Sequence, residues 1–218
     1  IKVHGHGRVE GVTVCDTDVK TKRPIPGTER FMECDTLLIS AGLIAENELS
    51  TNAGLALDRK TGGIVVDENF QSEIPGIFSA GNALHIHDIV DFVSEEGLAA
   101  GASAHEYVQN FDSFDLATDF IKVCDGENVN GCVPQKINKA ASGKLKVAFR
   151  VRQVLRNATI SILVNGEEVA HRKSMILVPA EMESIQFDVG EIAGASEIKL
   201  QAQGTPVSAK ELQGESSR

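Results

Sequence analysis

Two histidines separated by one residue are the side chains of this sequence with the clearest capacity for chemistry. His85 and His87 stand directly before Asp88. Imidazole binds transition metals, and an imidazole beside a carboxylate can move protons near neutral pH. Three interpretations remain open: metal ligands, an acid–base pair beside a substrate, or loop histidines with structural hydrogen bonds only. Because no third ligand cluster is in view, we predict no metal site.

The cysteines show no pattern of redox or metal chemistry. Cys15, Cys34, Cys124 and Cys132 form no CxxC pair and have no histidine at zinc-ligand spacing. We therefore interpret them as structural thiols and predict no bridge between Cys124 and Cys132. The sequence also has no GxGxxG placed between a strand and a helix, so it lacks a dinucleotide fingerprint of its own.

Composition and charge exclude several classes of protein. The 218 residues are 42% hydrophobic and 24% charged, as expected for a soluble globular protein of two domains. No apolar run approaches the roughly 20 residues of a membrane helix, and no secretory signal is visible, so we predict a cytoplasmic protein without membrane insertion. The net charge of −10 argues against nucleic acid as a partner. Because the first residue is Ile1, we expect a piece of a longer polypeptide.

The elements that would position these side chains change in type along the chain. Residues 1–33 contain β-branched runs separated by a proline-rich loop, which predicts a small antiparallel β-meander whose last strand extends to residue 39. Residues 34–118 alternate between short strands, at 61–67 and 76–82, and one convincing helix at 94–109. This order is typical of an α/β domain.

The predicted helix begins at Ser94, a suitable N-cap, and is lean in side chains. Gly97 and Gly101 lie in its middle among alanines. Glycine costs about 1 kcal/mol relative to alanine inside a helix, so its presence needs a reason. Close approach of a backbone or a flat ligand is one reason, and tight packing against a sheet is the other.

The C-terminal part of the sequence follows a different period. Residues 119–143 contain several turn signals and are expected to be a linker. Residues 144–205 alternate between apolar and polar side chains in short runs, with Asn165-Gly166 as a hairpin signal, and they predict an all-β antiparallel sandwich. Residues 206–218 are expected to be a flexible tail.

Three segments of residues 34–109, in this order, resemble the C-terminal half of FAD-dependent pyridine nucleotide-disulphide oxidoreductases. They are DTLLISAG at 35–42, IFSAGN at 77–82 and VSEEGLAA at 93–100. Within that family the sequence is most similar to FAD- and NAD-dependent dehydrogenases without a redox disulfide. The resemblance implies a partial FAD/NAD(P)-binding Rossmann-type domain, in which residues 1–33 end the NAD(P)-binding insert and residues 34–118 close the FAD-binding domain.

The same resemblance implies roles for particular residues. Gly81 and Asn82 would lie at the ribityl chain of FAD, the amides of Val93 and Ser94 at its pyrimidine edge, and Gly42 at the crossover between domains. Asn82 departs from the family pattern, where Asp is usual, but it keeps an acceptor and adds two donors. Residues outside this chain would complete the binding of both FAD and NAD(P)H.

The implied function is a hydride transfer between NAD(P)H and FAD, and from there to a small-molecule substrate or a partner oxidoreductase subunit, in an oligomeric enzyme. A hypothesis from another class also remains open. In it the α/β part is a degenerate cofactor scaffold, and the sandwich docks a partner through a basic stripe. That stripe comprises Lys144, Lys146, Arg150, Arg152 and Arg156, and a solvated sheet face is the simpler interpretation of it.

Overall fold

A computed structural model describes residues 2–18, 21, 23–40, 42–111 and 119–207. The chain divides into two compact units, Ile1–Leu43 and Ile44–Arg218, which are described separately. Most of the predicted tail lies outside the described residues. None of the described helices is long and apolar enough to cross a membrane.

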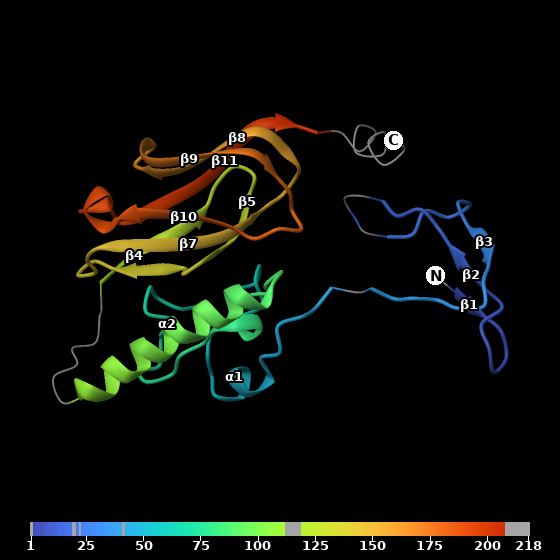
Figure 1. The fold of residues 1–218 in the computed structure, drawn as a ribbon, viewed down its shortest axis with the longest axis horizontal. Coiled ribbons are helices and arrows are strands. Elements are labelled where there is room, and N and C mark those ends of the chain that lie inside the picture. Colours follow the sequence, from blue (N-terminus) through green and yellow to red (C-terminus); the bar gives the residue numbers. More distant parts are fainter. Residues whose placement is uncertain (1, 19–20, 22, 41, 112–118, 208–218) are drawn as a thin grey trace. The chain divides into compact units, whose positions relative to one another are not determined.

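The first unit contains the predicted meander. Strands β1 (Lys2–His4), β2 (Gly11–Val14) and β3 (Arg30–Glu33) form an antiparallel sheet in the order β1-β2-β3 (Figure 1). Val12 is its buried apolar residue, which agrees with the expectation that so small a sheet has little core of its own.

The apolar run at 37–39 is not a strand, which corrects the prediction. Strand β3 ends at Glu33, and the side chains of Leu38 and Ile39 are 91% and 80% exposed. An apolar run becomes a strand only where a neighbouring strand satisfies its backbone N–H and C=O groups. Among the described residues, no strand pairs with this run.

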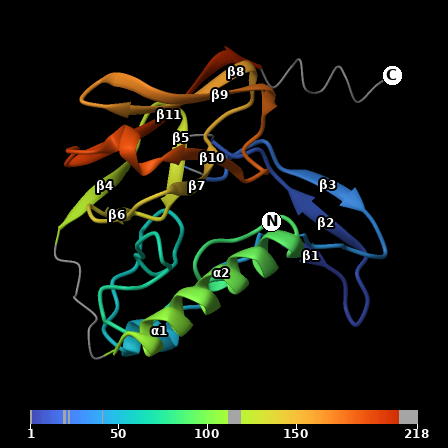
Figure 2. The same ribbon diagram turned by 60° about the vertical axis from the view of Figure 1, so that its left-hand side comes forward.

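The second unit is dominated by a β-sandwich (Figures 1 and 2). One sheet has the order β10-β7-β5 and the other β6-β4-β11-β8-β9. Strands β4 and β11 are parallel, so the sandwich is mixed and not wholly antiparallel. The strands are β4 (Phe120–Asp125), β5 (Val129–Val133), β6 (Lys136–Asn138), β7 (Lys144–Val151), β8 (Leu155–Val164), β9 (Glu167–Leu177), β10 (Glu183–Asp188) and β11 (Glu197–Pro206).

Alternation of side chains explains much of this architecture. Along β7, Val147, Phe149 and Val151 are buried, and the residues between them are partly exposed. The turn between β8 and β9 has Asn165 at φ 54° and Gly166 at φ 88°, which confirms the predicted hairpin. The two runs expected after this turn are one continuous strand, β9.

Residues 119–143 are not a linker. They supply β4, β5 and β6, and the side chains of Ile121, Val123 and Ile137 enter the sandwich core. The turn signals that predicted a linker belong to tight connections between these strands: Asn128 and Gly131 both have positive φ, 57° and 70°. Burial of the flanking apolar residues outweighs the local turn preference.

Residues 44–111 form a helical and irregular layer. It contains α1 (Glu48–Asn52), the 3-10 turn η1 (Gly81–Ala83) and α2 (Val90–Gln109). The strands predicted at 61–67 and 76–82 are reduced to the isolated bridges Leu57↔Ile64 and Gln71↔Phe78. A second apolar cluster includes Val66 and Leu84 together with Val133 of β5, so this layer and the sandwich share a core.

Helix α2 begins four residues earlier than predicted. Its N-cap is Ile89, and Ser94 lies one turn inside, where its hydroxyl donates to the carbonyl oxygen of Val90 at 3.1 Å. Ser94 is therefore not the N-cap. A Cβ added at Gly97 or Gly101 would meet no described atom within 4 Å. The close approach that we expected at these glycines is not found among the described residues.

Candidate functional site

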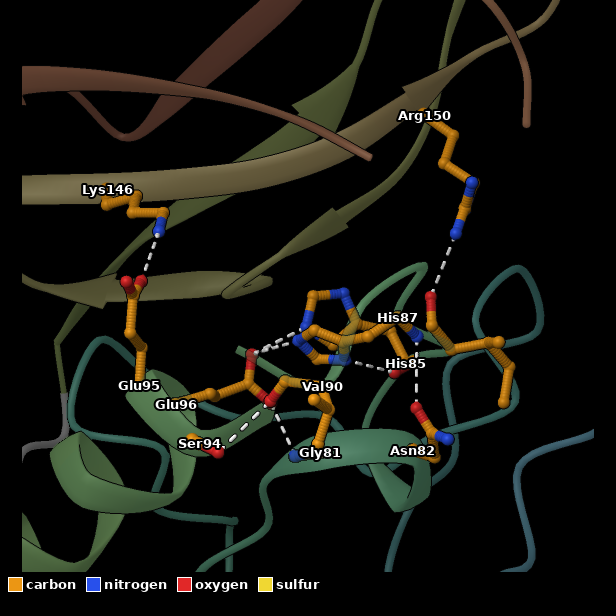
Figure 3. Close-up of polar contacts among 11 residues, drawn as sticks. Gly81, Asn82, His85, His87, Val90, Ser94, Glu95, Glu96, Lys146 and Arg150 are labelled. Atoms are coloured by element: carbon orange, nitrogen blue, oxygen red, sulfur yellow. Dashed lines mark hydrogen bonds and ion pairs between the residues drawn. The ribbon is translucent and has the colours of Figure 1, made fainter. Parts of the chain in front are cut away.

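Two histidines and one glutamate converge beside the start of α2 (Figure 3). His85 and His87 follow the 3-10 turn η1, and Glu96 extends toward them from the second turn of α2. Glu96 Oε2 lies 2.6 Å from His85 Nε2 and 3.4 Å from His87 Nε2. One ligand atom from each of the three side chains lies within 4.8 Å of the others. This group is called the His-His-Glu cluster below.

Hydrogen bonds to the backbone orient the cluster. The N–H of Gly81 donates to Glu96 Oε1 at 2.6 Å, and the backbone N–H of His87 donates to Asn82 Oδ1 at 3.0 Å. His87 Nδ1 lies 2.9 Å from the carbonyl oxygen of His85. A carbonyl oxygen only accepts, so Nδ1 carries a proton, and Nε2 is the basic nitrogen of the neutral ring.

The three side chains are shielded from solvent. Those of His85, His87 and Glu96 are 5%, 2% and 10% exposed. Burial lowers the pKa of His87, while the nearby carboxylate of Glu96 opposes that shift. The neutral imidazole is therefore the favoured form of His87 at neutral pH.

The loop that carries the histidines is fastened to the sandwich. Arg150 of β7 pairs with Asp88 and also donates from Nη2 to the carbonyl oxygen of Ile86 at 3.0 Å. Asp88 additionally accepts the backbone N–H of Met182. Beside it, Lys146 Nζ lies 3.7 Å from Glu95 Oε2 (Figure 3). Two members of the predicted basic stripe thus face α2 and the loop before it.

A cleft of about 420 Å³ separates α2 from the sheet β10-β7-β5, and the His-His-Glu cluster lies in its wall. Both acidic and basic side chains line it. The charged lining residues are Glu68, Glu95, Glu96, Lys144, Lys146 and Glu183. Burial raises the pKa of Glu68, which also accepts the backbone N–H of Asn138 at 2.8 Å.

Sequence reasoning singled out the two histidines and missed Glu96, which it treated only as an acid of the helix's first turn. A usable signal was present: Glu96, Ala100 and Tyr107 share one face of α2, and this face is the less exposed one. Arg150 was counted in the stripe, and nothing in its sequence context indicates the pairing with Asp88, 62 residues away.

The residues predicted for FAD lie in different places. Gly81 opens η1 with φ 65°, and a Cβ there would lie 3.1 Å from Val93 Cγ1, so Gly81 and α2 are close together. Asn82 is exposed, and Ser94 lies inside the helix. Gly42 is exposed and belongs to the first unit, so its position relative to the other four is not defined.

The first turn of α2 is open. Ile89 has extended backbone, and among the described residues its side chain makes no capping hydrogen bond. The side chains of Ile89 and Val90 are 48% and 72% exposed. Uncapped N–H groups at an exposed helix N-terminus favour electronegative ligand atoms. The pyrimidine edge of a flavin fits these donors, which belong to residues 90–92 and not to Val93 and Ser94.

The four cysteines are free thiols, and Cys132 is buried. Burial raises the pKa of the Cys132 thiol, so this group is a neutral thiol at physiological pH. These findings agree with the interpretation of the cysteines as structural residues.

Comparisons with known proteins assign the first part of the chain. Residues 1–105 match the family model for pyridine nucleotide-disulphide oxidoreductases. A thioredoxin reductase of Listeria monocytogenes is 35% identical over 95 residues, which cover 43% of this chain and 29% of that protein. A dihydrolipoyl dehydrogenase of Manduca sexta is 32% identical over 91 residues, 41% of this chain and 18% of that protein.

A mercuric reductase of Shewanella putrefaciens is 30% identical over 108 residues, which cover 46% of this chain and 19% of that protein. The chain thus spans less than a third of the length of these relatives. No solved structure matches it significantly. Residues 1–105 are therefore part of a pyridine nucleotide-disulphide oxidoreductase domain, distantly homologous to thioredoxin reductase, lipoyl dehydrogenase and mercuric reductase, in a family whose members bind FAD and NAD(P).

Proposed function

We propose that this chain supplies the flavin-facing part of an FAD-dependent oxidoreductase that moves a hydride between NAD(P)H and FAD. From FAD the electrons pass to a small-molecule substrate or to a partner subunit. The observation that carries the proposal is the family match over residues 1–105, which contains both η1 and the open first turn of α2. The dinucleotide fingerprints, which this chain lacks, come from residues outside it.

The first turn of α2 supplies electrostatic stabilisation. FAD, when bound, provides the hydride acceptor and gains negative charge at its pyrimidine edge on reduction. A helix N-terminus carries roughly half a positive elementary charge, together with free backbone N–H groups. Residues 90–92 can thus favour the reduced ring without a charged side chain, although Asp91 in the same turn opposes part of this effect.

Asn82 is the residue best suited to hold the sugar-like part of the cofactor. Its Oδ1 accepts the backbone N–H of His87, so the orientation of its carboxamide is defined. The Nδ2 group points away from this bond (Figure 3) and is free to donate to a hydroxyl or phosphate oxygen. An exposed amide held in one orientation is preorganised for such a bond.

The test is flavin retention by the full-length protein that contains these residues. We expect Asn82→Leu to lower FAD affinity about tenfold, which corresponds to about 1.4 kcal/mol for a lost hydrogen bond. Asn82→Asp keeps the acceptor for His87 and should retain more flavin. Asn52→Leu, an exposed change at the end of α1, is the matched control. Equal FAD affinity in Asn82→Leu and the parent protein would remove Asn82 from the site.

A second candidate is a non-catalytic interaction module built on a degenerate cofactor scaffold. One observation favours it: the Gly81 N–H, which faces a cofactor in the flavin proposal, is already bonded to Glu96. In this case the full-length protein shows no flavin absorbance after incubation with FAD and gel filtration.

A further inference from the structure

We propose that His85, His87 and Glu96 bind a divalent transition-metal ion of the Zn²⁺ type, with an open coordination position facing the cleft beside α2. This site goes beyond the proposed flavin function and does not depend on it. The sequence gave no reason to expect it, because the third ligand comes from a helix face that only the fold brings to the histidines.

The hydrogen bonding of His87 is the first argument. Its Nδ1–H donates to the carbonyl oxygen of His85 at 2.9 Å, so Nε2 of the neutral ring carries a lone pair. That lone pair is directed at Glu96 Oε2, 3.4 Å away. Two acceptors then face each other across a space with no proton between them. A metal cation in that space would bond to both.

The second argument is the support behind the ligands. Metal-binding imidazoles usually donate their other N–H to a carbonyl or carboxylate, and metal-binding carboxylates are themselves hydrogen-bonded. His87 meets the first condition through the His85 carbonyl oxygen. Glu96 meets the second, because Oε1 accepts the Gly81 N–H and leaves Oε2 for the histidines. Both ligands are therefore oriented before any ion arrives.

The spacing of the ligand atoms is the third argument. Ligands of a tetrahedral zinc ion, with bonds of about 2.0–2.1 Å, lie roughly 3.3 Å apart. The separation of His87 Nε2 from Glu96 Oε2, 3.4 Å, already matches this value. The separation of His85 Nε2 from Glu96 Oε2 is 2.6 Å, a hydrogen bond that must lengthen when an ion replaces its proton.

The chemistry of the ligands identifies the class of ion. Two imidazole nitrogens and one carboxylate oxygen suit Zn²⁺ and its first-row neighbours better than Ca²⁺ or Mg²⁺, which prefer oxygen. Three protein ligands leave a fourth position for water or a substrate atom, as in catalytic zinc sites. The cleft gives an entry path to this position, and Glu68, Glu95 and Glu183 line the same cleft.

The experiment is Co²⁺ titration of the purified full-length protein without flavin, followed by visible absorption. We expect one Co²⁺ per chain, with a ligand-field spectrum free of thiolate charge-transfer bands. Glu96→Gln should weaken binding at least tenfold, in line with what ligand-shell changes cost. This variant keeps an acceptor for the Gly81 N–H, so the loop can still fold. His87→Ala should weaken binding to a similar degree.

His105→Ala is the matched control, because His105 is an exposed histidine on the same helix. We expect it to bind Co²⁺ with the affinity of the parent protein. A second measurement is the thermal midpoint: Zn²⁺ should raise it in the parent and in His105→Ala, and should leave Glu96→Gln unshifted. Absence of stoichiometric binding in the parent, or equal affinity in the parent and Glu96→Gln, overturns the proposal. Because flavin is absent throughout, a failure here leaves the flavin proposal standing, and the reverse also holds.

Discussion

Arg150 and Asp88, 62 residues apart in sequence, form the ion pair that fastens the histidine loop to the sandwich. Both side chains are 27% exposed, and Arg150 also donates to the carbonyl oxygens of Ile86 and Ala180. One guanidinium thus joins the loop, β7 and the segment before β10. The position of His85 and His87 depends on this contact between distant elements.

Replacement of this arginine should loosen the loop. We expect Arg150→Met to lower the free energy of unfolding by about 1–3 kcal/mol, because it removes several charge-assisted hydrogen bonds while keeping most of the aliphatic stem. Hydrogen exchange at the amides of residues 85–88 should become faster. Arg59→Met, at an exposed arginine, is the control and should change stability by less than about 0.5 kcal/mol. Unchanged exchange at 85–88 in Arg150→Met would contradict this role.

Asp125 of β4 should make stability depend on pH in the acid range. Burial by itself would raise its pKa, but hydrogen bonds from Lys60 and from the backbone N–H groups of Gly131 and Cys132 hold that pKa below its ordinary value. The folded state therefore binds this proton more weakly than the unfolded state. The contribution of Asp125 is complete above the unfolded pKa and is lost as the pH falls through the folded pKa.

We accordingly expect Asp125→Asn to cost about 1–3 kcal/mol at pH 7, because its amide places N–H donors against donors. The difference from the parent should shrink as the pH falls below the ordinary range of an aspartate. Asp119→Asn removes an exposed pair with Lys139 and should cost less than about 1 kcal/mol. Urea unfolding at several pH values measures both variants. An Asp125→Asn penalty that stays constant down to pH 2 would refute the linkage.

Glu68 should show the opposite behaviour. Burial raises its pKa, so its charged form is disfavoured in the folded state above the folded pKa. Glu68→Gln keeps an acceptor for the N–H of Asn138 and removes the buried charge. We expect this variant to be more stable than the parent at pH 7 by up to about 1 kcal/mol, and equally stable below the unfolded pKa. Glu33→Gln, at an exposed position, serves as the reference, and a less stable Glu68→Gln at pH 7 would count against the assignment.

Two glycines should respond in opposite directions to alanine. A Cβ at Gly97 meets no described atom within 4 Å, so Gly97→Ala should stabilise α2 by about 0.5–1 kcal/mol. A Cβ at Gly63 would lie 1.7 Å from the carbonyl oxygen of Leu84, so Gly63→Ala must displace the residue before His85. We expect Gly63→Ala to lower the thermal midpoint and Gly97→Ala to raise it. If Gly97→Ala weakens FAD retention while it stabilises the protein, a ring lies across this face.

The predicted fold is accurate where local pattern and burial agree. Val147, Phe149 and Val151 alternate along β7, and Asn165-Gly166 forms the hairpin turn between β8 and β9. It fails where turn signals are dense: Ile121 and Val123 alternate in the same way, but the Asp-Gly and Asn-Gly pairs that follow them indicated a linker. Short strands bounded by tight turns are recognisable only once their partner strands are known.

The candidate site could be predicted only in part. His85 and His87 stand out because two histidines in one short segment are rare and chemically versatile. Glu96 was missed because the start of α2 was placed at Ser94, which put this residue in the first turn of the helix. With the start at Val90, Glu96 lies in the second turn, and its carboxylate reaches both histidines.

The amino-acid sequence alone determined the family signature of the first half and the alternating strands of the second, because both are expressed in neighbouring residues and their period. Tertiary structure alone decided that Glu96 meets the two histidines, that Arg150 holds their loop, and that residues 37–39 lie exposed without a partner strand. Each of these outcomes depends on which distant segments bury surface against each other and satisfy their polar groups, and no local pattern contains that information.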